Sequence, residues 1–164
     1  MSRKPPRPSH GSQHHDGGLP FVDVHEVLVA APADAVWRSL ARQVVHQKIT
    51  GNEVLARVLD TAAKRASGTA LAEGATVPGF TVAESSPGER LRLVGRHRFS
   101  RYALVFTLAP RPTGTVLAAH TYAEFPGMTG FVYRRLVIGS GAHRLLVRRM
   151  LRSVRHHAET DGAR

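Results

Sequence analysis

The stretch from Thr129 to Glu159 constrains the fold most, because it is the only long run whose apolar residues repeat with the period of a helix. A helix of about thirty residues, roughly 45 Å long at 1.5 Å per residue, must lie across an apolar surface to be stable, and a sheet is the obvious partner. The apolar stripe comprises Val132, Leu136, Gly139, Ser140, His143, Leu146, Val147, Met150 and Val154, and the basic face comprises Arg134, Arg144, Arg148, Arg152 and Arg155.

The middle of this stripe consists of small residues. Gly139, Ser140, Gly141 and Ala142 follow one another where large side chains are expected if the helix only fills a core. Small residues there allow a kink or leave space. Two interpretations follow: a ligand cavity between the helix and its sheet, or a kinked helix packed directly on the sheet.

Length and composition indicate one domain with a real core. The chain has 164 residues, of which 42% are hydrophobic, and it contains no cysteine. Disulfides, thiolate metal sites and cysteine nucleophiles are therefore excluded. We find no apolar run of about eighteen residues and no apolar segment before a cleavage site, so we expect a cytoplasmic protein. We expect a disordered arm over residues 1–20, a folded domain over 21–159 and a disordered tail over 160–164.

The net charge of +11 is concentrated near the end of the sequence, where residues 129–164 contribute +6. A basic helix face attracts phosphate, so an anionic membrane surface is one possible partner. The alternative is a hydrated outer face. No helix-turn-helix, zinc-finger or ribonucleoprotein pattern is present, which argues against nucleic-acid binding.

Alternating apolar residues and turn signals predict an α+β order of elements. One strand and two helices precede consecutive strands joined by short turns, and such strands pair antiparallel, with the long helix on one face of the sheet. The expected elements are a strand over 21–30, a helix from Pro32 to about Gln43, a second helix from Asn52 to about Ser67, a loop over 71–78, strands over 80–84, 90–98, 102–108 and 115–124, and the final helix.

The opening of the domain resembles the START-like (SRPBCC) superfamily, which includes polyketide cyclases, dehydrases and lipid-transfer domains. The resemblance rests on the strand ending Val27-Leu28-Val29, the following Ala30-Ala31-Pro32-Ala33-Asp34-Ala35-Val36-Trp37, the segment from Arg90 to Tyr102 and the terminal helix. It covers roughly residues 21–158. It implies a helix-grip fold, in which a curved antiparallel sheet wraps a C-terminal helix around an apolar cavity. These proteins share a fold and a cavity rather than one chemistry, so the resemblance does not select an activity.

We expect this cavity to bind a hydrophobic or amphipathic small molecule, lipid or polyketide-like, mainly through burial of its carbon surface. The alternative is a cyclase or dehydratase, which needs inward-facing acid and base groups. His143 is the candidate for such a role, because its place on the stripe points it toward the sheet. The expected ligand-binding residues are Tyr102, Leu104, Phe106, Leu136, Gly139, Ser140, His143 and Val147.

Other chemistries find less support in the sequence. It contains no Gly-x-Ser-x-Gly elbow, His-Glu-x-x-His helix or phosphate-binding glycine loop. His10, His14, His15 and Asp16 lie in the expected arm, where flexible histidines bind metals without a defined role. We therefore expect no cofactor and no metal site, while the oligomeric state stays open.

Overall fold

The computed structural model describes residues 15–46, 71–77, 79–97, 100–125 and 141–161. The described elements are, in chain order, β1 (His15–Asp16), β2 (Leu19–Val29), α1 (Ala33–His46), β3 (Thr76–Val77), β4 (Phe80–Ser86), β5 (Arg90–His97), β6 (Ser100–Arg111), β7 (Gly114–Glu124) and α4 (Ala142–Asp161). This is the expected α+β order. The second helix, expected from Asn52, lies outside the described residues.

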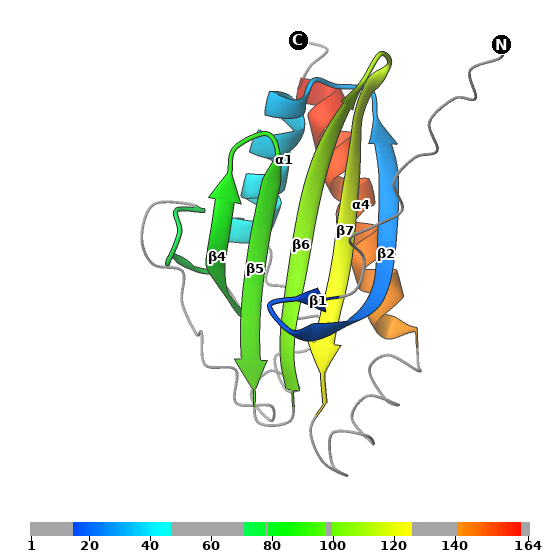
Figure 1. Cartoon of the computed structure of the whole chain (residues 1–164). Coiled ribbons are helices and arrows are strands. Elements are labelled where there is room, and N and C mark those ends of the chain that lie inside the picture. The colour runs from blue at the N-terminus through cyan, green and yellow to red at the C-terminus, as the bar shows by residue number, and fades with distance from the viewer. Residues whose placement is uncertain (1–14, 47–70, 78, 98–99, 126–140, 162–164) are drawn as a thin grey trace, which may run out of the picture.

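The strands form one antiparallel sheet in the order β1-β2-β7-β6-β5-β4-β3. Consecutive strands β4 and β5, β5 and β6, and β6 and β7 pair directly, whereas β2 pairs with β7, far along the chain. The register shifts between Phe21 and Asp23 and again between Val82 and Glu84. Such irregularities bend a strand and increase its twist. The sheet curves as a result, and both described helices lie behind it in Figure 1.

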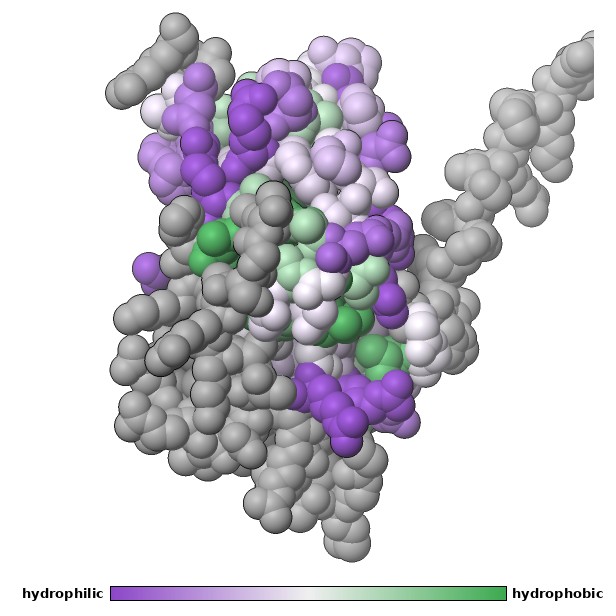
Figure 2. All heavy atoms as spheres, turned by 90° about the vertical axis from the view of Figure 1, so that its left-hand side faces the viewer, coloured by the Kyte–Doolittle hydropathy of each residue, from purple (hydrophilic) through white to green (hydrophobic). Residues whose placement is uncertain are grey.

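The main core lies between the sheet and the two helices. Alternate residues of β6 and β7 face it, with Phe106 and Leu117 fully buried, while α4 contributes Val147 and Val154. Arg144, Arg148, Arg152 and Arg155 are exposed, as the sequence predicts. Leu146 departs from the predicted stripe, because 40% of its side chain is exposed. Figure 2, which faces the β4 side of the molecule, shows apolar residues in a middle band with hydrophilic residues above and below.

The fold begins earlier than the sequence predicts. β1 pairs with the start of β2 through His15 opposite Pro20 and Asp16 opposite Leu19, inside the segment that we expected to be a disordered arm. Gly17 and Gly18 form the turn, with φ of 61° and 82°. A two-residue hairpin turn of the primed type needs positive φ at both positions, which glycine adopts without strain. The Gly-Gly pair is therefore the signal that our sequence interpretation missed.

The final helix begins later than predicted. α4 starts at Ala142, and Gly141 before it has a φ of 73°, which is not helical. The predicted helix over 129–159 therefore does not run continuously through Gly141, and its part over residues 129–140 lies outside the described residues. α1 runs to His46 rather than to about Gln43, and Thr76–Val77 forms a short strand within the expected loop. Within the described ranges, no helix is long and apolar enough to cross a membrane.

Candidate functional site

A carboxylate and two histidines meet where β2 and β7 contact the first turn of α4. Asp23 and His25 lie on the same side of β2 as the core residues Val27 and Val29, because side chains alternate along a strand. Asp23 is directly opposite Thr121 on β7. His143 extends from α4 toward this pair. The position of His143 thus agrees with the expectation that its side chain faces the sheet.

The geometry around His143 is that of a hydrogen-bonded, half-buried imidazole. Its Nε2 atom lies 3.0 Å from Thr121 Oγ1, and either atom can donate, depending on the tautomer. The same nitrogen lies 3.7 Å from Asp23 Oδ1, which is within reach of an ion pair but too long for a good hydrogen bond. Burial lowers the pKa of His143, although the nearby charge of Asp23 opposes this effect. The neutral form of the ring is therefore favoured.

Among the described residues, no hydrogen-bond donor reaches the Asp23 carboxylate. Its side chain is 13% exposed, and within the described part of the chain neither of its oxygens has a hydrogen-bond partner. Among the described residues, the cationic or ionisable groups close to it are His25 Nε2 at 3.5 Å, His143 Nε2 at 3.7 Å and Arg144 Nε at 3.9 Å. A buried carboxylate without a hydrogen-bond donor costs free energy unless a further group supplies one. The cluster can thus accept a donor from a bound molecule.

The structure distributes the other predicted ligand-binding residues between different places. Leu104, Phe106 and Val147 are buried in the main core. Tyr102 lines a pocket near the start of β6, and its hydroxyl donates to the Gly79 carbonyl oxygen at 2.8 Å. Leu136, Gly139 and Ser140 lie outside the described residues. Of the predicted set, only His143 belongs to the cluster around Asp23.

Sequence reasoning missed Asp23, although a signal was present. In the run Phe21-Val22-Asp23-Val24-His25, Asp23 and His25 have the same alternation as the half-buried Val27 and the buried Val29. Two polar residues on the core-facing side of a strand suggest a site rather than a solvated surface. His120, which we considered a weaker candidate, lies on the other face of the sheet, where burial lowers its pKa.

Within the described residues, no group of three or more histidines and carboxylates has a metal-binding arrangement. The Asp23 cluster contains one carboxylate and two imidazoles, but they are spaced for ion pairs. Carboxylates and imidazoles at these distances can form hydrogen bonds and transfer protons.

The comparisons with known proteins identify the fold. No protein-family model matches the chain, and no curated protein matches it significantly by sequence. Solved structures do match: a putative uncharacterized protein from Rhizobium leguminosarum has a TM-score of 0.55 at 15% identity, covering 84% of this chain and 93% of that one. Protein NE0264 from Nitrosomonas europaea has a TM-score of 0.53 at 17% identity, with 92% and 100% covered.

A third match is the di-domain ARO/CYC StfQ from the steffimycin biosynthetic pathway, with a TM-score of 0.55 at 13% identity, covering 87% of this chain and 52% of that one. The chain has a START-like fold. At sequence identities this low, the structural matches show the fold alone and leave the activity open. The helix-grip arrangement fits the curved antiparallel sheet with α4 across one face.

Proposed function

We propose that this START-like domain binds a small molecule with an apolar body and a hydrogen-bond-donating group. The donor group would face Asp23, where β2, β7 and α4 meet. The observation that supports this proposal is the buried Asp23 carboxylate, whose oxygens have no hydrogen-bond partner among the described residues. A hydroxyl or amide of a ligand, placed between Asp23 and His143, would supply the missing donor.

Apolar surface for the rest of the ligand lies beside this cluster. Leu146 is three residues after His143 on α4, and residues three apart are neighbours on a helix surface. It keeps 40% of its side chain exposed. Covering such a side chain with ligand carbon contributes about 25 cal/mol per Å² of apolar area. Hydrophobic burial would supply affinity, and the polar cluster would set orientation.

The test compares molecules released from purified variants by mass spectrometry. We expect a defined small molecule to accompany the wild-type protein and to fall at least about tenfold in D23N, as loss of one charge-assisted hydrogen bond predicts. D34N is the matched control, because Asp34 is an exposed carboxylate that pairs with Arg38 on α1. The proposal fails if the wild-type protein releases no such molecule, or if D23N retains as much as D34N.

A second candidate function is a dehydratase or cyclase reaction at the same cluster, and His143 favours it. A neutral imidazole can take a proton, and Asp23 at 3.7 Å would stabilise the resulting imidazolium. Incubating the released molecule with fresh protein tests this candidate. Loss of one water from the molecule, or its conversion to an isomer that chromatography separates, with wild-type protein but not with H143Q would support catalysis; an unchanged molecule with both proteins would leave binding alone.

A further inference from the structure

The side of α4 that faces away from the sheet is exposed. α4 lies behind the sheet in Figure 1, and its buried residues Val147 and Val154 face the core. A helix turns by about 100° per residue, so the residues opposite these two fall within an arc of about 100°. All of them are exposed, and we call them the outer face of α4: Leu145, Arg148, Arg149 and Arg152.

Arginine gives this side of the helix an unbalanced positive charge. Arg144 and Arg155 flank the outer face and are also exposed. Arg144 lies 3.9 Å from Asp23, whereas no described carboxylate forms an ion pair with the other arginines of α4. The two carboxylates of the helix, Glu159 and Asp161, are in its last turn and already have partners just after β2 and on α1. The positive charge therefore extends along the helix for about 16 Å, at about 1.5 Å per residue.

Leu145 adds an exposed apolar side chain among these arginines. It is 64% exposed, the highest fraction among the large apolar residues that the structure describes. Arg148 and Arg149 follow it by three and four residues, which makes them its neighbours on the helix surface. The aliphatic stems of arginine extend this apolar area, while the guanidinium groups stay polar. Basic residues around an exposed leucine are typical of helices that lie in the interface of a membrane.

An anionic membrane fits this combination better than a nucleic acid does. Lipid phosphates and carboxylates would contact the guanidinium groups, and the acyl boundary would take up Leu145. A duplex offers phosphates without such a hydrocarbon layer, and single strands are bound largely by stacking on aromatic side chains. α4 contains no Phe, Tyr or Trp. Charge and apolar exposure together therefore favour a lipid surface.

We propose that the outer face of α4 docks this protein onto an anionic membrane surface. The guanidinium groups of this face would contact lipid headgroups, and Leu145 would enter the boundary between headgroups and acyl chains. Each arginine near an anionic surface strengthens binding about fivefold. This inference goes beyond the proposed function, because the outer face contains neither Asp23 nor His143 and docking needs no ligand in their cluster.

Sedimentation with vesicles tests the proposal on the full chain. One set of vesicles contains equal amounts of phosphatidylserine and phosphatidylcholine, and the other contains phosphatidylcholine alone. We expect the wild-type protein to bind the anionic set at about 0.1 M salt and to be released as the salt approaches about 1 M, where the Debye length falls to about 3 Å. R148Q/R152Q should bind about 25-fold more weakly and depend less on salt. L145Q should bind about tenfold more weakly with unchanged salt dependence, because it removes apolar contact alone.

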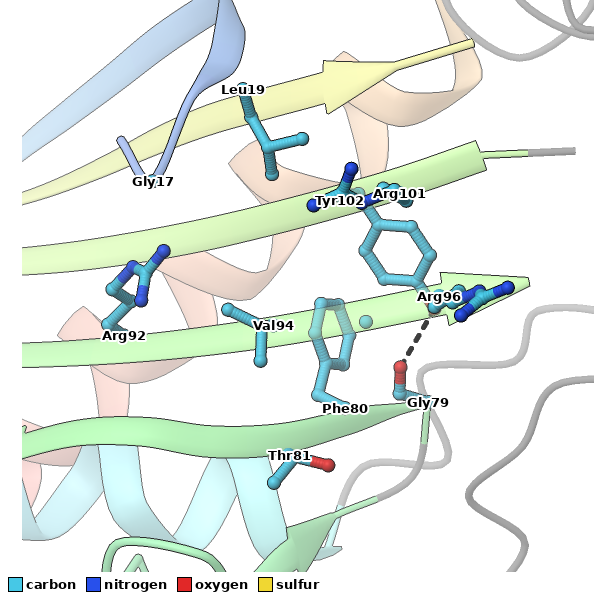
Figure 3. A pocket seen from close by; sticks show the side chains of 11 residues that line it. Gly17, Leu19, Gly79, Phe80, Thr81, Arg92, Val94, Arg96, Arg101 and Tyr102 are labelled. Atoms are coloured by element: carbon cyan, nitrogen blue, oxygen red, sulfur yellow. Dashed lines mark hydrogen bonds between the residues drawn. The ribbon is translucent and has the colours of Figure 1, made fainter. Parts of the chain in front are cut away.

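The matched control is R96Q/R101Q, which removes two charges from the opposite face of the sheet. Arg96 and Arg101 are directly opposite each other at the end of β5 and the start of β6, as Figure 3 shows. Side chains alternate along a strand, so both lie on the face opposite to the core residues Leu93 and Leu104. This variant should bind anionic vesicles nearly as well as wild type, because salt screens charges that lie more than a Debye length from the membrane.

Several results would overturn the proposal. If the wild-type protein does not bind anionic vesicles at low salt, the arginines form only a hydrated face. An equal loss in R148Q/R152Q and R96Q/R101Q would assign the attraction to net charge. Unchanged affinity in L145Q would contradict contact between Leu145 and lipid. Tighter binding to a DNA duplex than to the vesicles would assign the face to nucleic acid. Circular dichroism melting checks that each variant is folded, which we expect because all the substituted side chains are exposed.

Discussion

At the scale of single residues, two opposing effects decide the charge of His143. Burial disfavours the imidazolium and lowers the pKa below its ordinary value of 6.5, while the charge of Asp23 raises it; burial is the larger effect. His25 and Arg144 add to the lowering. The neutral ring does not balance the charge of Asp23, which leaves the exposed Arg144, with its Nε at 3.9 Å, as a described counter-charge. The residue-level geometry therefore leaves a carboxylate that a ligand donor would stabilise.

This lowered pKa predicts how stability depends on pH. In the unfolded chain His143 takes up a proton as the pH falls through about 6.5, whereas in the folded chain it does so only at lower pH. The unfolded state then binds more protons, so the free energy of unfolding falls as the pH decreases below 6.5. His120 contributes in the same direction. We expect urea unfolding to show a steeper loss for wild type than for H143Q between pH 7 and pH 5.

The control for this prediction is H120Q, which removes the other histidine with a lowered pKa and should also flatten the profile. Equal pH dependence of the free energy of unfolding in the wild type and H143Q would contradict a lowered pKa of His143 in the folded protein.

The same residues show what the sequence could predict about the site. The helical period placed His143 on the side of α4 that faces the sheet. Asp23 was missed because its role depends on pairing with β7, about a hundred residues later, which brings it opposite Thr121. Its alternation with Val27 was visible, but the register shift between Phe21 and Asp23 was not. A local pattern predicts which face a residue is on; it does not predict its long-range partner.

At the scale of elements, polar bonds fix the contact between α1 and α4. Ser39 Oγ donates to the Val154 carbonyl oxygen at 3.0 Å in a fully buried position. Gln43 Nε2 donates to Ser153 Oγ at 2.6 Å nearer the surface, and Arg42 pairs with Asp161 at the end of α4. At the other side of the helix, the Ala30 backbone N–H donates to Glu159 Oε1 at 3.0 Å. Together these bonds set the position of α4 along the sheet.

Replacing Ser39 with alanine tests the buried bond. Loss of a buried hydrogen bond costs about 1 kcal/mol, partly offset because alanine favours a helix by up to about 0.5 kcal/mol. S153A is the comparison variant, since it has the same gain in helix propensity but removes the bond from Gln43 at a half-buried position, where water can replace it. We expect chemical unfolding to show S39A as the less stable of the two. If S39A equals S153A in stability, the Ser39 bond does not position the helix.

Element prediction succeeded where the period was strong and failed where backbone conformation decided the boundary. Strands β4 to β7 and α1 match their predicted ranges within a few residues, because alternation and turn residues define them. The start of α4 depends on the positive φ of Gly141, and the β1–β2 hairpin depends on Gly17 and Gly18. A glycine permits such a conformation without requiring it, so the sequence alone left these boundaries open.

At the scale of the whole molecule, the order of strands predicts where the structure is most protected from local opening. β6 and β7 are the longest paired neighbours in the middle of the sheet, and each is hydrogen-bonded on both sides. Their core-facing residues, including Phe106 and Leu117, are fully buried. β1 and β3, two residues each, lie at the two ends of the sheet order. Local opening is therefore easier at the ends than in the centre.

Native-state hydrogen exchange measures this difference. We expect the amides of Val105 and Ala118 to exchange only through global unfolding, whereas that of Leu19 exchanges through local opening of the hairpin. S39A provides an internal control, because a loss of global stability should speed exchange in β6 and β7 by the same factor and leave β1 unchanged. Exchange of Val105 as fast as that of Leu19, or an insensitivity of β6 to S39A, would show that the sheet and the α1–α4 pair do not unfold as one cooperative unit.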